Sequence, residues 1–359
     1  MGQPRRASRA RLRGVLATAR SGHVSARALA IADSRALVRS LFLASAVRVG
    51  LLDCLRAGRG DGKGRTGPEG RSIPEIAALT ACRRTDRLQA WLDVGTELGE
   101  IALRDGRYRL RGRRARAIAA GDALLRAHYR SMLDYQVGPY ADLAALLRSE
   151  PGDGRADLDD YADDIAQVST AAAPFIASYL TLVVGDARPA RILDVGCGTA
   201  VYSTIAAGID PRVQIDGIDL AEAVVETARA ELRTAGLSAR IRLHVGDVRH
   251  WNPGPGIRYD LILLLNNVYY FPPGERVQLY RQLGELLSGR GELVVASQTA
   301  PGSIAAAHLH FMLTCQEGAA ALPSPVELSA DLSSAGFDVA DAQLIVPTEP
   351  FQAIRAVRR

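Results

Sequence analysis

The residues best placed to do chemistry form a tight turn after a short apolar strand. The strand 191–195 contains Asp194, and the turn Gly196-Cys197-Gly198-Thr199-Ala200 opens a helix at about 199–208. Glycines let the backbone turn tightly and approach a ligand, while the N–H groups of the following helix face that ligand. The turn therefore predicts a nucleotide-type cofactor site. Glycines that serve only strand-to-helix packing are the alternative.

Two more carboxylates follow expected strands further along the chain. The strand 213–220 contains Asp219, about twenty residues after the glycines, and the strand 241–245 is followed by Asp247. In doubly wound sheets an acid at the first of these positions accepts hydrogen bonds from ribose hydroxyls. The spacing therefore predicts that the turn and both acids serve one ligand.

A fourth expected strand supplies amides at the same edge. Residues 259–265 are a continuous apolar run, as in strands buried on both faces of a parallel sheet, and they end in Asn266 and Asn267. Ligands of open α/β sheets bind at the carboxyl ends of the strands, near the point where strand order reverses. We expect a single binding edge there.

These residues resemble the class I S-adenosylmethionine-dependent methyltransferases. The family's first motif, acidic-x-Gly-x-Gly-x-Gly, is matched from Asp194, with Ala200 in place of the third glycine. A dinucleotide dehydrogenase would instead carry Gly-x-Gly-x-x-Gly. The resemblance covers roughly residues 188–359 and implies a Rossmann-like, seven-stranded sheet in a domain at 183–359.

The same resemblance implies which residues bind S-adenosylmethionine. Gly196 and Gly198 flank its methionine part, Asp219 holds the ribose, and Asp247 with Val248 meets the adenine. The full set of expected cofactor contacts is Asp194, Gly196, Cys197, Gly198, Asp219, Leu220, Asp247, Val248 and Asn266.

Composition sets further limits. The chain has 359 residues, of which 48% are apolar, and these side chains are enough to form one large and one small core. The four cysteines stand far apart without a Cys-x-x-Cys pair, so neither a zinc ribbon nor a disulfide framework is indicated. No run of eighteen apolar residues and no signal-peptide core occurs. We expect a cytoplasmic protein without a membrane span.

The net charge of +5 arises from the N-terminal arm. Residues 1–32 hold seven arginines and no acid, so the rest of the chain nets about −2. Such an arm can touch nucleic acid or an anionic membrane. It has no aromatic residues that could stack on bases, which favours a basic disordered arm over 1–33.

Residues 34–118 have the pattern of a winged helix. Helical periodicity covers 34–57, a second helix at 72–79 follows the cap Ser72, and a third spans 85–98. The alternating runs of 101–110 around Asp-Gly predict a β-hairpin. One rival function follows, a winged-helix DNA-binding regulator that senses S-adenosylmethionine.

The third helix argues against that rival, because Asp86 and Asp93 lie on the face that would meet phosphates. The combination of domains resembles small-molecule methyltransferases of secondary metabolism, whose winged helix serves dimerisation. This resemblance implies a homodimer with the apolar helix 37–52 in the interface, a small-molecule substrate and no nucleic-acid partner.

The segment 119–182 is expected to connect the domains and roof the substrate pocket. It is rich in large apolar side chains, which line the pocket or belong to the core, the core being favoured: Tyr129, Met132, Tyr135 and Phe175. Arg130 is a candidate partner for a substrate carboxylate, with a solvated arginine as the alternative.

Methyl transfer needs an aligned nucleophile and a base that takes its proton. In plant-type O-methyltransferases a histidine follows the fourth strand, but Tyr270 stands there, three residues after Asn267. Both are candidate catalytic residues, although a tyrosine with a pKa of ~10 is a poor base at neutral pH. His308 and His310 after the fifth strand are the substitutes. On a helix they diverge by about 200°, so only one of them would face the pocket.

The acceptor stays open between two chemistries. The layout of 266–271 and 308–312 is similar to C-methyltransferases of α-keto acids, some of which hold a divalent metal through two histidines. Asn266 and Asn267 stand where that pattern has a histidine, so the sequence does not support a metal. O-methylation of a hydroxyl or carboxyl group of a secondary metabolite or fatty acid is the alternative.

Overall fold

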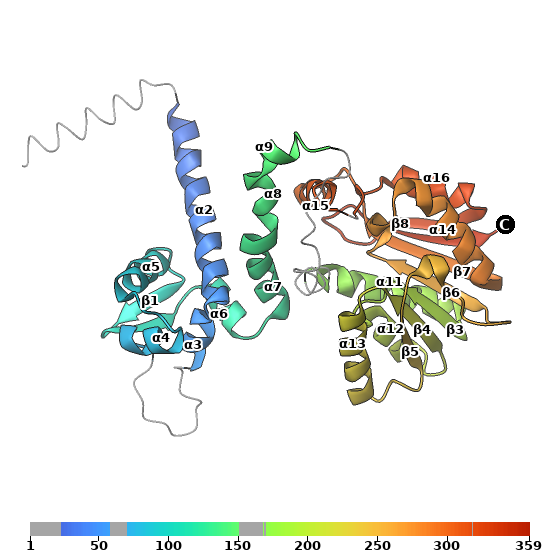
Figure 1. Cartoon of the computed structure of the whole chain (residues 1–359), viewed down its shortest axis with the longest axis horizontal. Helices are drawn as coiled ribbons and strands as arrows, with labels where there is room; N and C mark the ends of the chain where they lie inside the picture. The colour runs from blue at the N-terminus through green and yellow to red at the C-terminus, as the bar shows by residue number, and fades with distance from the viewer. Residues whose placement is uncertain (1–22, 58–69, 151–167, 169, 318) are drawn as a thin grey trace, which may run out of the picture. The chain divides into compact units, whose positions relative to one another are not determined.

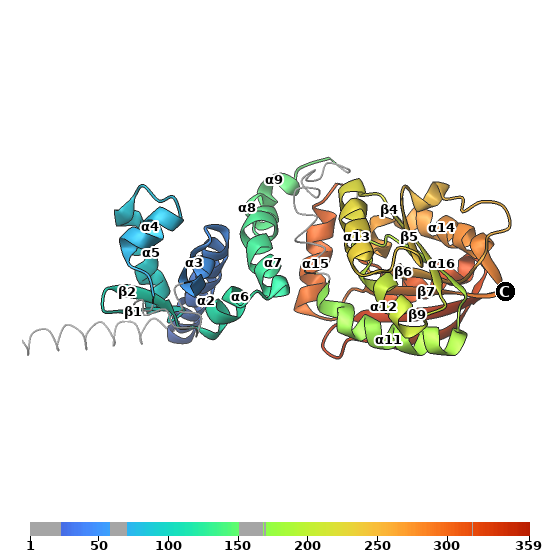
Figure 2. The same ribbon diagram turned by 90° about the horizontal axis from the view of Figure 1, so that it is seen from below.

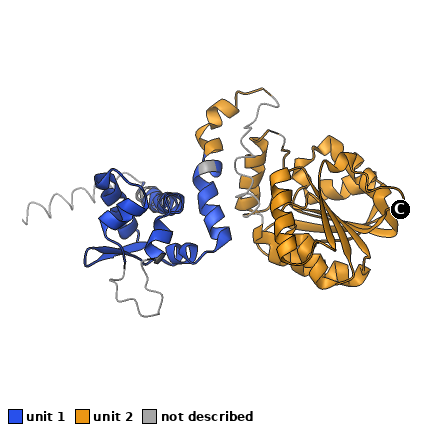
Figure 3. Ribbon diagram, turned by 60° about the horizontal axis from the view of Figure 1, so that its bottom comes forward, with its two compact units in different colours: residues 1–137 blue, residues 138–359 orange. Residues whose placement is uncertain are grey.

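The computed structural model describes residues 23–57, 70–150, 168, 170–317 and 319–359. The chain divides into two compact units, Met1–Val137 and Gly138–Arg359 (Figure 3). This division falls inside the expected connector 119–182. Its first part belongs to the N-terminal unit and its remainder to the C-terminal one.

The first unit is mostly helical with one hairpin. Its elements are α2 (Val24–Arg48), α3 (Leu51–Ala57), α4 (Ile73–Leu79), α5 (Thr85–Glu97), β1 (Ile101–Arg104), β2 (Arg107–Leu110), α6 (Arg113–Ala119), α7 (Ala123–Ser131) and the π-helix η1 (Met132–Gln136). Its core gathers one or two large apolar residues from most of these elements, among them Leu43, Leu51, Ile76, Leu92 and Ile101. The predicted hairpin around Asp105-Gly106 is present, with both residues at positive φ.

Two expectations about the first helix were wrong. The helix expected over 34–57 breaks at Gly50, whose φ of 72° ends α2 before α3 begins. Residues 24–33, expected in the disordered arm, are the first turns of α2. Alanine, leucine and arginine, which are frequent there, are strong helix formers. The expectation of disorder gave the positive charge of the arm more weight than this helix propensity. Residues 1–22 lie outside the described residues.

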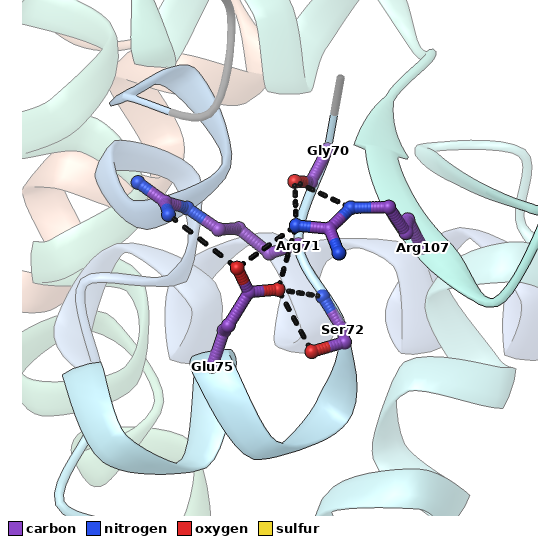
Figure 4. A network of polar contacts seen from close by, with 5 residues as sticks. All are labelled: Gly70, Arg71, Ser72, Glu75 and Arg107. Atoms are coloured by element: carbon purple, nitrogen blue, oxygen red, sulfur yellow. Dashed lines mark hydrogen bonds and ion pairs between the residues drawn. The ribbon is translucent and has the colours of Figure 1, made fainter. Parts of the chain in front are cut away.

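A polar network fastens the hairpin of the first unit to α4 (Figure 4). Glu75 accepts from the backbone N–H and the hydroxyl of Ser72, both at 2.7 Å, and from Arg107 on β2 at 2.7 Å. Arg107 also donates to the carbonyl of Gly70. These bonds hold the pKa of Glu75 down at about 2, the Ser72 backbone bond being the largest cause. Ser72, predicted as the cap, forms a capping box with Glu75, and this box also anchors the hairpin.

The second unit is an α/β domain. Its strands are β3 (Arg191–Val195), β4 (Gln214–Asp219), β5 (Ile241–Val245), β6 (Tyr259–Leu265), β7 (Leu287–Gln298), β8 (Phe337–Leu344) and β9 (Phe351–Arg358). Its helices are α8 (Gly138–Ala141), α9 (Leu143–Leu146), α11 (Ala173–Ala187), α12 (Val201–Ile209), α13 (Glu222–Thr234), α14 (Pro273–Leu286), α15 (Ile304–Thr314) and α16 (Pro325–Ser334). Short 3-10 turns are η3 (Thr170–Ala172), η4 (Val248–His250) and η5 (Val268–Tyr270).

The seven strands form one sheet in the order β5-β4-β3-β6-β7-β9-β8 (Figures 1 and 2). β5 to β7 are parallel, and β9 is antiparallel to both β7 and β8. From β3 the chain first adds β4 and β5 on one side and then β6 and β7 on the other. The order therefore reverses between β3 and β6, where such sheets bind ligands. The predicted seven-stranded Rossmann-like sheet is confirmed.

Helices cover both faces of the sheet. One face packs against α11, α12 and α13, and the other against α14 and α16. Strands β3, β4 and β6 are almost wholly buried, which explains their apolar runs.

One described stretch, Thr170–Ala187, is long and apolar enough to span a membrane by length and composition. Its buried residues in α11, including Ile176, Leu180 and Val184, pack into the core of the sheet. The expectation from the sequence, that no run of eighteen apolar residues occurs, missed this stretch because its small and polar residues interrupt the apolar ones.

Candidate functional site

The turn after β3 consists of small residues, so a ligand can approach its backbone closely. Gly196, Gly198 and Ala200 all have positive φ, at 62°, 52° and 58°. A Cβ on Gly196 would lie 2.2 Å from Nδ2 of Asn267, so glycine is required there for space as well as for conformation. Ala200 adopts the left-handed conformation at the third glycine position, which costs a non-glycine residue about 1–2 kcal/mol.

Asp219 at the end of β4 fixes this turn. Its Oδ2 accepts from the backbone N–H of Gly198 at 2.8 Å, and its Oδ1 accepts from the N–H of Ala221 at 2.9 Å. Each oxygen keeps a further lone pair, and Asp219 is half-buried at a cavity. The carboxylate can therefore hold the turn and still accept from a ligand hydroxyl.

Asp194 has a different position from the one expected. It is buried, with 1% of its surface exposed, and accepts from the hydroxyl of Ser203 on α12 at 2.6 Å. Burial raises the pKa of Asp194 to about 6 against the opposing Ser203 bond. It does not line the described cavity, and its hydrogen bond with Ser203 holds α12.

A cavity of about 380 Å³ opens at the carboxyl ends of the strands. It brings together ten residues singled out from the sequence: Gly196, Cys197, Gly198, Asp219, Leu220, Asp247, Val248, Asn266, Asn267 and Tyr270. They come from the end of β4 and from the turns after β3, β4, β5 and β6. The reversal between β3 and β6 is what assembles them, as the strand pattern predicts.

Asn267 is the most constrained polar group in this cavity. It is 8% exposed, and its Nδ2 donates to the carbonyl of Val195 at 2.5 Å. That bond fixes the amide orientation, because an oxygen in place of Nδ2 could not donate. Oδ1 of Asn267 is buried without a hydrogen-bond partner in the described chain. A buried acceptor left without a donor costs about 1–3 kcal/mol, which a ligand donor would recover.

The two candidate histidines lie on α15, a helix as predicted, but neither lines this cavity. Nδ1 of His308 is 2.9 Å from the hydroxyl of Tyr140, whose ring stacks on the imidazole. Burial lowers the pKa of His308, which favours the neutral ring. Nδ1 of His310 is buried without a partner in the described chain. The two rings thus have different surroundings, but neither faces this cavity, where one of them was expected.

Sequence reasoning missed Arg249 as a residue of the cavity. Arg249 donates to Asp247 through Nε at 2.9 Å and lies 2.8 Å from Glu275 through Nη1. Its hydrogen bonds lower the pKa of Asp247. The available signal was the spacing Asp-x-Arg, which says nothing about Glu275 on α14. Thr170, Tyr202, Tyr269 and Phe271 also line the cavity and were not singled out.

Residues of the connector have mixed positions. Tyr129 packs in the core of the first unit, Tyr135 is buried there, and Met132 is half-buried. Phe175 on α11 is 37% exposed, and Arg130 is exposed. Core packing, the favoured interpretation, therefore describes Tyr129 best. Among the described residues no three histidine, cysteine or acidic side chains gather as metal ligands, and all four cysteines are free.

Comparisons with known proteins agree with this geometry. A family described as "Methyltransferase domain" matches residues 192–291. The malonyl-[acyl-carrier protein] O-methyltransferase 1 of Ilyobacter polytropus is 32% identical over 136 residues, 38% of this chain and 47% of that protein. The tRNA1(Val) (adenine(37)-N6)-methyltransferase of Yersinia pestis is 33% identical over 84 residues, 23% of this chain and 33% of that protein. The chain thus spans less than half the length of these relatives.

Solved structures resemble nearly the whole chain. The mitomycin 7-O-methyltransferase MmcR superposes with a TM-score of 0.75 at 15% identity, over 94% of this chain and 99% of the other. Human N-acetylserotonin methyltransferase in complex with S-adenosylmethionine gives 0.68 at 17% identity, over 93% and 97%. Residues 192–291 are therefore a methyltransferase domain, in a chain with the class I fold of S-adenosylmethionine-dependent methyltransferases.

Proposed function

We propose that this protein transfers a methyl group from S-adenosylmethionine to a small-molecule metabolite. The observation that carries the proposal is one cavity that joins the glycine turn, Asp219 and Asp247 at the strand-order reversal. The similar human enzyme is described in complex with S-adenosylmethionine, and both similar sequences are named as methyltransferases. Together they support a cofactor cradle at this position.

In this proposal the cofactor lies along the carboxyl ends of β3, β4 and β5. Its methionine part lies against the small residues Gly196 and Gly198, whose own N–H groups donate to Ile218 and Asp219, and its ribose hydroxyls donate to Asp219. The adenine lies against Val248, beside Asp247. Cys197, Leu220 and Asn266 complete the walls. When bound, the cofactor supplies an electrophilic methyl group on a sulfonium.

Calorimetric titration with S-adenosylmethionine tests the cradle. Asp219→Ala removes the anchor of the turn and Gly196→Val places a side chain into Asn267, so both changes are expected to abolish binding. Arg212→Gln removes an arginine outside the cavity and should leave binding unchanged. Retained micromolar affinity in both cavity variants would overturn the assignment.

We infer that the acceptor is a hydroxyl group. The unpaired Oδ1 of Asn267 needs a donor, and an acceptor hydroxyl supplies one, whereas a carboxylate would be repelled. Several structurally similar proteins are described as O-methyltransferases. Asn267→Leu removes the acceptor Oδ1 while keeping a side chain of similar size. We expect it to lower turnover with hydroxyl acceptors by at least about tenfold, the effect of a lost buried hydrogen bond.

For the base we propose His308, with Tyr140 as a positioning residue. The neutral imidazole can donate Nδ1–H to the phenol and keep the Nε2 lone pair free. Because His308 does not line the cavity, the acceptor hydroxyl has to turn its one proton from Asn267 to His308 before the transfer. His308→Ala should lose most turnover and His310→Ala little. Tyr140→Phe should shift the acidic limb of the pH profile for kcat. Near-native rates in both histidine variants would remove both from the mechanism.

C-methylation of an α-keto acid is the second candidate. The observation in its favour is His310, whose buried Nδ1 has no hydrogen-bond partner among the described residues. A metal assay on the purified protein and turnover after chelation separate the candidates. Bound metal and loss of turnover with chelator would favour carbon chemistry over a hydroxyl acceptor.

We propose a homodimer formed through the first unit. The N-terminal half of α2 exposes apolar side chains that its own unit does not cover, including Leu29 at 65%, Ile31 at 72% and Leu37 at 57%. The expected interface helix 37–52 overlaps this exposed stretch at Leu37. Leu37→Asp should halve the mass measured by light scattering; an unchanged mass would place the interface elsewhere.

A DNA-binding role is not supported by α5. Its exposed residues include Asp86, Asp93 and Glu97, which would repel phosphates from the helix that should enter a groove. A gel shift with genomic fragments at physiological salt should show no specific retention. We place the enzyme in the cytoplasm, consistent with its free cysteines.

A further inference from the structure

Arg249 lies on the short turn η4 and lines the cavity, and its guanidinium contacts two carboxylates at once. On Asp247 its backbone N–H reaches Oδ1 at 2.8 Å, Nε reaches both oxygens at 3.1 and 2.9 Å, and Nη2 lies 2.7 Å from Oδ2. Its Nη1 lies 2.8 Å from Oε2 of Glu275. One guanidinium thus bridges the two carboxylates, and both Arg249 and Asp247 line the cavity.

A second Asp-x-Arg pair in the same unit shows which contacts are local. Arg212 binds Asp210 through its backbone N–H at 2.9 Å, Nε at 3.1 Å and Nη2 at 2.8 Å, nearly the distances of the Arg249 pair. The contacts of Arg249 with Asp247 are therefore a local motif of the Asp-x-Arg spacing. The bridge to Glu275 and the position in the cavity distinguish Arg249 from Arg212, which does not line the cavity.

If the cofactor is bound as proposed above, the hydrogen bonds that Asp247 already accepts from Arg249 affect how tightly the cofactor binds. Both oxygens of Asp247 already accept from Arg249, which leaves its lone pairs partly used before any ligand arrives. An adenine amino group that donates to Asp247 must share or displace the guanidinium. Glu275 offers Arg249 a second partner from α14, 26 residues further along the chain, so the guanidinium need not enter water without a counter-ion.

We propose that Arg249 sets the affinity of this site by competing with the cofactor for Asp247, and that Glu275 draws Arg249 away from Asp247. The inference rests on the proposed function, because it assigns the adenine end of that cofactor to Asp247. Arg249 then lowers affinity and Glu275 raises it. A purely structural bridge, which merely held η4 to α14, would make both residues raise affinity.

The test is whether substitutions of Arg249 and Glu275 change the affinity for the cofactor in opposite directions. Calorimetric titration of the full-length protein with S-adenosylmethionine and with S-adenosylhomocysteine should give about twofold to fivefold tighter binding for Arg249→Gln. Glu275→Gln should weaken binding by about the same factor, the range expected for one exposed ion pair. In the double variant Glu275→Gln should have no further effect, because there is no guanidinium left to withdraw.

Arg212→Gln is the matched control, since it removes the same local motif at a distance from the cavity, and its affinity should equal that of the wild type. Weaker binding in both Arg249→Gln and Glu275→Gln, or no change in either, would overturn the proposal. Thermal unfolding of each variant checks that it is folded. A wild-type protein that binds neither compound would refute the proposed function itself, which separates the two failures.

Discussion

Raising the pH from 5 to 7.5 is expected to destabilise the second unit through Asp194. The pKa of this buried carboxyl is raised to about 6 in the folded protein, mainly by desolvation, from 3.8 in the unfolded chain. A raised folded pKa means that the stabilising protonated form is complete below pH 3.8 and is lost as the pH rises through 6. One pKa unit corresponds to about 1.4 kcal/mol, so the full cost of ionising Asp194 is about 3 kcal/mol.

About half of that cost, roughly 1.4 kcal/mol, falls between pH 5 and 7.5, because Asp194 is still mostly protonated at pH 5. Asp194→Asn keeps the acceptor for the Ser203 hydroxyl but cannot ionise. The free energy of unfolding of the wild type, minus that of the variant, should therefore fall by about 1.4 kcal/mol across this range. All other titrating groups are shared by the two proteins and cancel.

Urea denaturation followed by tryptophan fluorescence measures this difference. Trp251 lies in the second unit and Trp91 in the first, so a Trp91→Phe background makes the signal report the unit that holds Asp194. Parallel stability curves for wild type and Asp194→Asn would refute the reasoning, because they would show that the carboxyl keeps an ordinary pKa despite its burial.

Three further outcomes follow from the backbone and packing around the turn. Ala200→Gly should change stability by less than about 1 kcal/mol, because relief of the positive φ offsets the lost buried methyl, whereas Ala200→Val should cost about 2–3 kcal/mol in thermal or urea unfolding. Equal effects would show that φ is not decisive there. Gly217→Ala should destabilise by about 1–3 kcal/mol, since its Cβ would lie 2.7 Å from Leu243 and 3.0 Å from Cys197, and wild-type stability would contradict the packing. Burial raises the pKa of the Cys197 thiol, so iodoacetamide at pH 8 should label half-buried Cys82 well before Cys197, as read by mass spectrometry; prior labelling of Cys197 would contradict its burial.

The cofactor edge could be predicted because it depends on local patterns. Apolar runs that end in Asp219 or Asn266 specify strands, and parallel strands bring their carboxyl ends together whatever the side chains between them. The hairpin at Asp105-Gly106 is similarly local, because the turn residues alone specify its type.

The rest depends on contacts between distant segments. The amide of Asn267 is fixed by Val195, 72 residues away, and His308 meets Tyr140, 168 residues away. No spacing rule relates such positions. Asp194, the acidic residue of the glycine motif, was expected to contact the ligand. It is instead buried in the core, where it accepts a hydrogen bond from Ser203 on the next helix.

In the proposed function the cavity binds S-adenosylmethionine, and the glycine turn is not a dinucleotide site. Titration of the wild-type protein with S-adenosylmethionine, S-adenosylhomocysteine and NAD⁺ under one condition distinguishes these two kinds of site. We predict one site per chain for the first two, each displacing the other, and no measurable heat with NAD⁺. Binding of NAD⁺, or of none of the three compounds, would show that the cavity is not an S-adenosylmethionine site.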